Sequence, residues 1–164
     1  MSELSDLLER YRRGAELLAV ATTGAAGAEL DFKPGAGKWS VREIACHLAD
    51  SEAAAAMQFR QIIAEENPTL ASYDQEAWTA NLGYEKRKIS QAIETFRVVR
   101  FWNYELLKDL REETFSRTGT SPALGQVTLL QFLRGMAEHA ESHAKQIQGV
   151  RAAFKQHKAK QAAQ

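Results

Sequence analysis

Residues 37–50 read Gly-Lys-Trp-Ser-Val-Arg-Glu-Ile-Ala-Cys-His-Leu-Ala-Asp and contain a clear helix start. Ser40 and Glu43 have the spacing of a capping box, in which a serine caps the helix and a glutamate three residues later bonds back to it. Apolar residues at helical spacing follow, and they end before Pro68, through which a helix does not continue. The sequence therefore predicts a long helix over residues 41–65.

A second capping box, formed by Thr128 and Gln131, predicts another long helix that runs to about Phe154. Residues 4–21 and 84–110 have apolar side chains three and four residues apart, which is the pattern of amphipathic helices. No strand-like alternation is long enough to compete with these helices. Helices with one apolar face each can bury those faces against one another, so the predicted fold class is all-α, a four-helix bundle.

The segments between these helices are rich in glycine, proline and polar residues. We expect a long loop between the first two helices, an irregular segment before the third and another connection before the fourth, at residues 22–37, 68–83 and 112–126. The bundle is expected to form one domain over residues 1–155. A polar tail, residues 156–164, is expected to fray into solvent.

Composition excludes several classes of function. The 164 residues contain 21 basic and 21 acidic side chains, and this balanced charge gives no sign of a basic face for nucleic acid. No stretch has the length and apolar character of a membrane span, and the first residues lack the pattern of a signal peptide. Cys46 is the single cysteine, which excludes an intrachain disulfide. We expect a soluble cytoplasmic protein without nucleic-acid or membrane partners.

Three histidines are candidate metal ligands. His139 and His143 are four residues apart in the fourth predicted helix, so their imidazoles lie on one helical face and can bind one ion. His47 lies in the second helix and is flanked, like this pair, by alanines that leave room for close helix packing. Three imidazoles would leave coordination positions open, as catalytic sites do. The alternative is that all three are ordinary polar residues of a helical core.

Two other metal motifs do not fit. A zincin has glutamate directly after its first histidine, where this chain has Ala140. Di-iron bundles have a glutamate three residues before a histidine. Here those positions are occupied by Ile44, Met136 and Ala140.

The stretch Lys38-Trp39-Ser40, with Glu43, His47 and Leu48 after it and a His-x3-His pair near the end, resembles the DinB-like superfamily, which includes the YfiT-like metal hydrolases. The resemblance covers nearly the whole chain in helix order. It implies a divalent metal bound by one histidine of the second helix and two of the fourth, which correspond to His47, His139 and His143. Nickel or zinc is the metal most often bound in that family, and manganese or iron are alternatives.

Other side chains near the predicted site have two interpretations each. Asp50 and Gln146 stand three residues after a histidine, so either could orient a ligand, and Asp50 could equally be a solvated surface carboxylate. Aromatic side chains could line a pocket beside the metal, although helical spacing favours a place in the core: Tyr73, Trp78, Tyr84, Phe101 and Trp102. Cys46 is turned about 100° from its neighbour His47 and is interpreted as packing.

The resemblance implies an enzyme that uses the metal to activate water or a low-molecular-weight cofactor thiol. The expected activity is that of a hydrolase or of a thiol-dependent transferase or isomerase, with a small-molecule substrate. A metal-bound thiolate needs no protein nucleophile, which suits a chain without a recognisable catalytic serine or cysteine. The alternative is a non-catalytic metal-binding or stress-response bundle. The sequence leaves the substrate, the thiol and a homodimer open.

Overall fold

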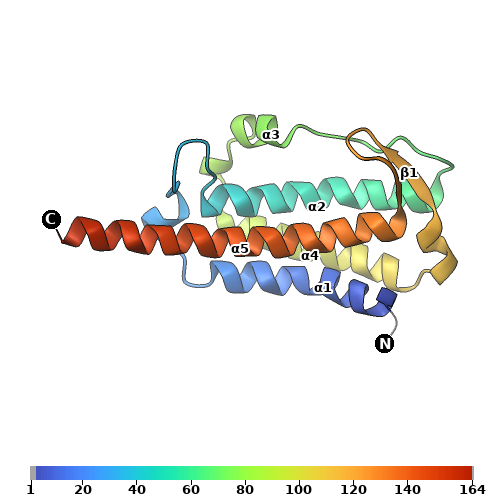
Figure 1. Cartoon of the computed structure of the whole chain (residues 1–164), viewed down its shortest axis with the longest axis horizontal. Coiled ribbons are helices and arrows are strands. Elements are labelled where there is room, and N and C mark those ends of the chain that lie inside the picture. Colours follow the sequence, from blue (N-terminus) through green and yellow to red (C-terminus); the bar gives the residue numbers. More distant parts are fainter. Residues whose placement is uncertain (1–2, 164) are drawn as a thin grey trace.

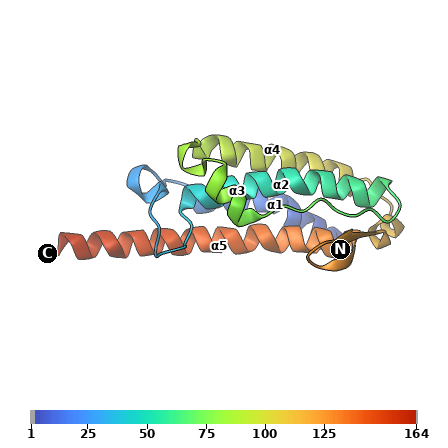
Figure 2. The same cartoon turned by 90° about the horizontal axis from the view of Figure 1, so that it is seen from above.

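The computed structural model describes residues 3–163 and consists mainly of helices. The long helices are α1 (Glu3–Thr22), α2 (Val41–Ala64), α4 (Ile89–Lys108) and α5 (Leu129–Ala162), which form a four-helix bundle (Figures 1 and 2). Helix α1 packs against α4 and α5, and α2 packs against the same two helices from the other side. Helices α1 and α2 therefore stand diagonally opposite each other, and the predicted fold class is confirmed.

Both predicted capping boxes are present. The backbone N–H of Glu43 donates to Ser40 Oγ at 3.2 Å, and Glu43 Oε2 accepts from the backbone N–H of Ser40 at 2.8 Å. Thr128 and Gln131 make the same reciprocal pair at the start of α5. These bonds satisfy N–H groups that a helix start leaves without partners, and they fix where α2 and α5 begin.

The predicted third helix begins later than expected. Residues Tyr84–Lys86 form a separate 3₁₀ turn after Gly83, which has a φ of 65°, and Arg87 is extended before α4 begins at Ile89. Glycine adopts a positive φ at little cost, whereas other residues do not. Gly83 therefore allows the chain to change direction between α3 and α4. The prediction of helix from residue 84 was therefore wrong by five residues, because apolar spacing does not register this turn.

A short β-hairpin lies in the connection before α5, where no strand was predicted. Strands β1 (Thr118–Ser121) and β2 (Gly125–Thr128) pair antiparallel, and the N–H of Leu70 donates to the carbonyl of Thr120 at 2.9 Å. The hairpin thereby holds the segment that follows α2 at one end of the bundle. Helix α3 (Gln75–Asn81) comes next and lies against α2, with Asp74 as its N-cap.

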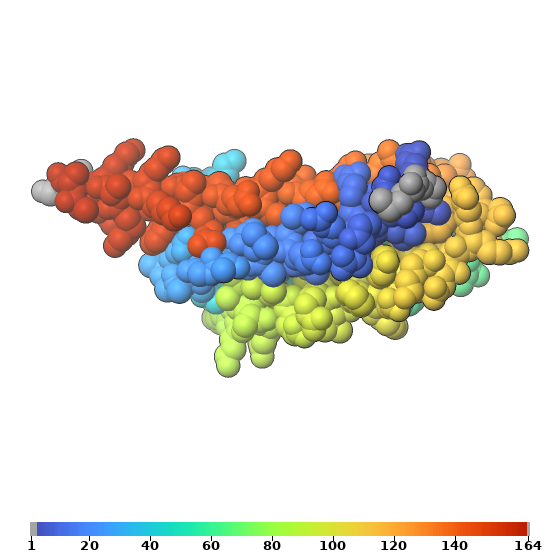
Figure 3. Space-filling view, turned by 90° about the horizontal axis from the view of Figure 1, so that it is seen from below, coloured from blue at the N-terminus to red at the C-terminus, as the bar shows by residue number. Residues whose placement is uncertain are grey.

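The remaining segments are two further 3₁₀ turns, Gly27–Leu30 in the long loop and Glu112–Ser116 before the hairpin. No described helix combines the length and the apolar composition needed to cross a membrane. Helix α5 continues to Ala162 through the polar tail, and its side chains from Lys155 onward are exposed. Figure 3 shows this end of α5 projecting beyond α1 and α4. The division into domain and tail at residue 155 stays a prediction.

The core has two apolar clusters with a layer of buried polar side chains between them. Along α2, Leu48 belongs to the first cluster and Ala55 to the second, and Glu52 lies between them. Along α4, Arg100 has the same intermediate place. Its guanidinium donates to Glu52 Oε2 at 2.7 Å, and both side chains are fully buried. A buried ion pair therefore crosses the middle of the bundle.

Candidate metal centre

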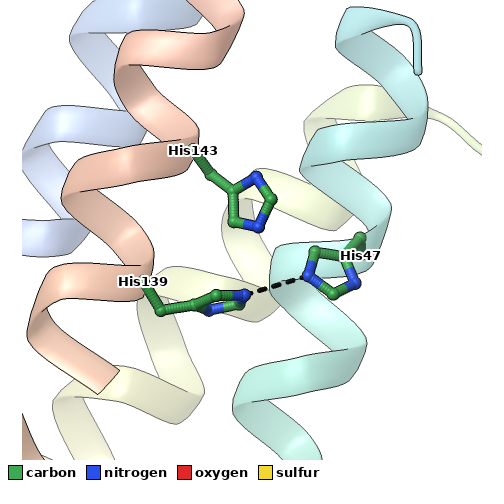
Figure 4. Close-up of side chains that lie close together, drawn as sticks. All are labelled: His47, His139 and His143. Atoms are coloured by element: carbon green, nitrogen blue, oxygen red, sulfur yellow. Dashed lines mark hydrogen bonds between the residues drawn. The ribbon is translucent and has the colours of Figure 1, made fainter. Parts of the chain in front are cut away.

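Helices α2 and α5 bring the three predicted histidines together. His47 comes from α2, two turns after the Ser40 cap, and His139 and His143 come from successive turns of α5. Figure 4 shows the three rings converging on the space between these two helices. The ring centroids lie 4.5 to 5.1 Å apart, and His47 is only 2% exposed.

The spacing of the ring nitrogens suits a metal ion. One nitrogen from each ring can be chosen so that all three lie within 4.8 Å of one another, and Nε2 of His47 is 3.0 Å from Nε2 of His139. Nitrogens bound to one ion at about 2.1 Å, with angles of about 90 to 109°, lie roughly 3.0 to 3.4 Å apart. The His47 and His139 pair already has this separation, and the three residues could hold one ion after small side-chain adjustments.

Gln146 sets the tautomer of His143. Its amide oxygen Oε1 lies 2.7 Å from Nδ1 of the ring. An amide oxygen can only accept, so Nδ1 donates, and Nε2 keeps the lone pair that a metal needs. Gln146 thus has the orienting position expected of it from its spacing in the helix.

His139 has a different environment. Its Nδ1 is buried and has no hydrogen-bond partner among the described residues. The hydrogen that this atom carries when Nε2 binds a metal is therefore not directed by a protein acceptor. The ring is held by packing against its neighbours and by the contact of its Nε2 with Nε2 of His47, and not by any partner of Nδ1.

Burial keeps the three imidazoles neutral. It lowers the pKa of His47 to about 4 and that of His139 to about 3, and in both cases the charge of His143 lowers the pKa further. The pKa of His143 is also lowered by burial, against an opposing effect of Gln146. Neutral imidazole is the form that binds metals, so at neutral pH the three rings are in the protonation state that a metal site would require.

Trp39 covers one side of the cluster. Its ring centroid is 4.9 Å from that of His47 and 6.2 Å from that of His143. The rings of Trp39 and His143 are nearly parallel, with an angle of 13° between their planes. Ala140 and Ala144 are buried beside the pair on α5 and leave room for close approach. The indole limits the access of water from this direction.

A cavity of about 310 Å³ opens over the cluster. Its lining includes His139, His143 and Gln146 from α5, with Lys38 and Trp39 from the loop before α2 and Gln75 and Glu76 from α3. The donor set thus consists of three neutral imidazoles with a polar cavity on one side, which fits a metal with open coordination positions. That α3 borders the site was not predicted, because its seven residues are too few to show a periodic apolar face.

Other predicted neighbours of the site lie elsewhere. The carboxylate of Asp50 accepts a hydrogen bond from the Tyr84 hydroxyl at 2.7 Å, so its action on His47 stays a prediction. Cys46 is buried, which agrees with a packing role, and burial raises the pKa of its thiol to about 11. Phe101 and Trp102 are 44% and 59% exposed, so the expectation of core positions was wrong for these two.

A polar network that the sequence analysis missed lies next to the histidines. Arg100 donates to the carbonyls of Tyr11 and Met136 at 3.1 and 3.0 Å as well as to Glu52, whose carboxylate also accepts from the Tyr11 hydroxyl. Met136 is one turn before His139, and the charge of Arg100 contributes to the low pKa of that imidazole. The sequence does contain a signal for this network, because Glu52 and Arg100 are charged residues on otherwise apolar helix faces.

Comparison with known proteins gives consistent results. The family model of the DinB superfamily matches residues 10–147. Curated relatives from Oceanobacillus iheyensis and Bacillus cereus are 29% and 27% identical over 119 and 123 residues, which cover 73% and 75% of this chain and 69% and 70% of theirs. Both carry the name "Putative metal-dependent hydrolase".

Two solved structures have a similar fold. YfiT from Bacillus subtilis, described as "a probable metal-dependent hydrolase with an unusual four-helix bundle topology", superposes with a TM-score of 0.87 and 22% identity over 94% of this chain and 90% of its own. A mycothiol-dependent maleylpyruvate isomerase superposes with a TM-score of 0.68 and 14% identity over 87% of this chain and 60% of its own. At these identities the similarity concerns the fold alone.

Proposed function

This chain belongs to the DinB superfamily, and on that premise we propose that His47, His139 and His143 bind one divalent metal ion in the active site of a small-molecule hydrolase. The observation that carries the proposal is the convergence of three neutral imidazoles beside a polar cavity, which His139 and His143 line. The curated relatives named as metal-dependent hydrolases support the same class of reaction. Nickel or zinc is the proposed metal, with manganese or iron as alternatives.

Each side chain has a defined task in this proposal. Gln146 holds the proton on Nδ1 of His143 and so keeps Nε2 available, while Trp39 shields the imidazoles from bulk water. A divalent ion bound there acts as a Lewis acid that lowers the pKa of a bound water or thiol. Glu76 and Lys38, which line the cavity, supply charged groups that can orient a polar substrate.

A thiol-dependent transferase or isomerase is the second candidate. The fold similarity to the mycothiol-dependent isomerase favours it, and the thiol would have to be a separate small molecule. Cys46 cannot serve, because burial raises the pKa of its thiol to about 11 and a buried thiol of this kind is a poor nucleophile.

A homodimer and a cytoplasmic location are also part of the proposed function. The homodimer rests on the family resemblance, and the location rests on the composition.

Metal analysis tests the site. We expect about one nickel, zinc, manganese or iron per chain in untagged protein purified without chelator, and loss of that metal in a His139→Ala/His143→Ala double variant. The control is His157→Ala, which removes an exposed histidine of α5 outside the cluster. Absence of metal from the wild type, together with failure to bind each ion on addition, would rule out the proposal.

The alternative of a non-catalytic metal protein predicts a different coordination shell. X-ray absorption of the zinc or nickel form is expected to give three imidazole nitrogens and at least one exchangeable oxygen, because the cavity borders the cluster. A shell completed by a fourth protein ligand would favour a structural metal. With an open shell, screening of ester, amide and thiol-conjugation substrates follows, with the double variant as the blank.

A further inference from the structure

A second cavity, of about 430 Å³, lies between α2 and residues 71–82, the segment that contains α3. We propose that this pocket binds a small organic cation, in which a protonated amine is carried by an apolar or aromatic body. The volume is within the range of small-molecule pockets, about 300 to 1,000 Å³. The inference goes beyond the metal site and holds whether or not a metal is bound.

The apolar surfaces of the pocket form its first argument. Met57 on α2 and Leu82 after α3 are 53% and 39% exposed, although both are large apolar side chains. Tyr73 and Trp78 also line the pocket and stack on each other, with centroids 4.3 Å apart and ring planes at 28°. Such a wall offers flat surfaces for an aromatic body, and its ring faces attract a cation.

The charge at one end of the pocket forms the second argument. Asp50 lines the pocket and is half-buried, and its Oδ2 accepts the Tyr84 hydroxyl. None of the ion pairs among residues 3–163 includes Asp50, and its other oxygen has no hydrogen-bond partner in that range. A carboxylate that lacks a cation beside apolar walls is a complement for an ammonium group.

Arg87 also lines the pocket, and its positive charge would favour an anionic ligand instead of a cation. This side chain is exposed, and its Nε donates to the carbonyl of Leu82 at 3.3 Å. Water screens an exposed charge more strongly than a half-buried one, so the carboxylate is expected to dominate recognition. An aromatic anion would bind instead if Arg87 dominated, and the experiment separates the two.

The pocket adjoins the histidine cluster through α3 and the residues before it. Tyr73 and Trp78 line this pocket, whereas Gln75 and Glu76 line the cavity over the histidines. A ligand in the pocket would therefore contact the same short segment that borders the candidate metal centre. Metal and ligand nevertheless have separate sets of contacts, so either can be tested without the other.

The test uses the chelator-treated 164-residue chain, ¹⁵N-labelled, with 2-phenylethylamine as the cation and 3-phenylpropionate as the anion. The chain has three tryptophans, and the indole signal of Trp78 is assigned by its loss in Trp78→Phe. We expect the amine to shift the Trp78 signal, to leave that of Trp102 unchanged, and to bind at least about tenfold more tightly than the carboxylate. Equal or tighter binding of the carboxylate would overturn the proposal.

A matched pair of variants locates the charge that recognises the amine. Asp50→Asn keeps an acceptor for Tyr84 and is expected to weaken amine binding by about tenfold, whereas Asp109→Asn, at the far end of α4, is expected to leave it unchanged. Unchanged binding in Asp50→Asn contradicts the proposal. The comparison of amine with carboxylate in the wild type does not depend on the folding of any variant. Loss of the metal site would likewise leave this result untouched.

Discussion

His143 shows how a single hydrogen bond can prepare a histidine for metal binding. The ring has two nitrogens, and Gln146 binds the hydrogen of Nδ1, which leaves Nε2 as the only possible ligand atom. His47 and His139 lack such a partner for their second nitrogen among the hydrogen bonds described, and packing holds them instead. The three candidate ligands therefore differ in how firmly their metal-binding form is fixed.

Gln146→Ala tests this difference. We expect the variant to bind zinc or nickel about 10- to 100-fold more weakly than the wild type, because His143 loses the acceptor that fixes its tautomer and orientation. Competition with a chromophoric chelator measures the affinity. Gln148→Ala, which changes an exposed glutamine on the same helix, is the control and should bind as the wild type does. Equal affinities in the two variants would contradict the role assigned to Gln146.

The low pKa values of the histidines predict that the metal-free protein loses stability in acid. Below pH 6.5 the unfolded chain binds protons on His47 and His139, whereas the folded protein does so only near pH 4 and pH 3. Because the unfolded state binds more protons in this window, the free energy of unfolding falls as pH falls from about 6.5 to about 4, by on the order of 3 kcal/mol for each histidine.

Urea unfolding of chelator-treated protein between pH 7 and pH 4.5 measures this effect. Carboxylates also titrate at the acid end, so His47→Gln/His139→Gln is needed for comparison and should lose less stability over the same range. If the two proteins follow the same pH dependence, the imidazoles take up protons in the folded state and the proposed neutral cluster is wrong.

Sequence patterns predicted the start of some helices accurately and missed other elements. Capping boxes at Ser40 and Thr128 located the starts of α2 and α5 to the residue, because the cap is a local bond between side chain and backbone. The start of α4 and the hairpin β1–β2 were missed, since the first follows a separate turn at Gly83 that apolar spacing does not register, and the strands of the second have only four residues each, too few for an alternating pattern. A capping box has a recognisable side-chain pattern in the sequence, whereas these two features do not.

Ser40→Ala measures how much the first of these caps stabilises the bundle. The variant loses the acceptor for the backbone N–H of Glu43 and is expected to lower the free energy of unfolding by about 1 kcal/mol. Thr128→Ala should have a similar effect on α5, because its geometry is the same. Urea unfolding with circular dichroism gives both values. A midpoint unchanged in both variants would show that neither cap stabilises the fold.

Across the whole molecule, the buried pair of Glu52 and Arg100 joins all four long helices. Arg100 on α4 contacts α1 through Tyr11, α2 through Glu52 and α5 through Met136. Gly14 on α1 makes this possible, since a Cβ at that position would lie 1.9 Å from the guanidinium. The histidine positions follow from the relative placement of α2 and α5, which this layer helps to fix. Sequence analysis identified the three histidines that the fold brings together but not this layer, because burial of a charge depends on its partners.

Removing one member of the pair is expected to be costly. Glu52→Gln leaves the guanidinium of Arg100 buried without a carboxylate, and we expect the free energy of unfolding to fall by about 3 to 5 kcal/mol. Glu94→Gln breaks the exposed pair with Arg97 and should leave the urea midpoint nearly unchanged, because water screens these charges. Glu52→Leu/Arg100→Met removes both charges and should be more stable than Glu52→Gln. Equal urea midpoints for Glu52→Gln and Glu94→Gln would contradict this account.

The length of α5 also has a geometric use. Its 34 residues span about 51 Å, against about 36 Å for the 24 residues of α2, and the last turns stand clear of the other helices (Figure 3). A second protein joined to Ala162 by a continuous helix would be held on a stiff spacer. Each inserted residue would move it outward by about 1.5 Å and rotate it by about 100°, so both its distance and its direction could be set by counting residues.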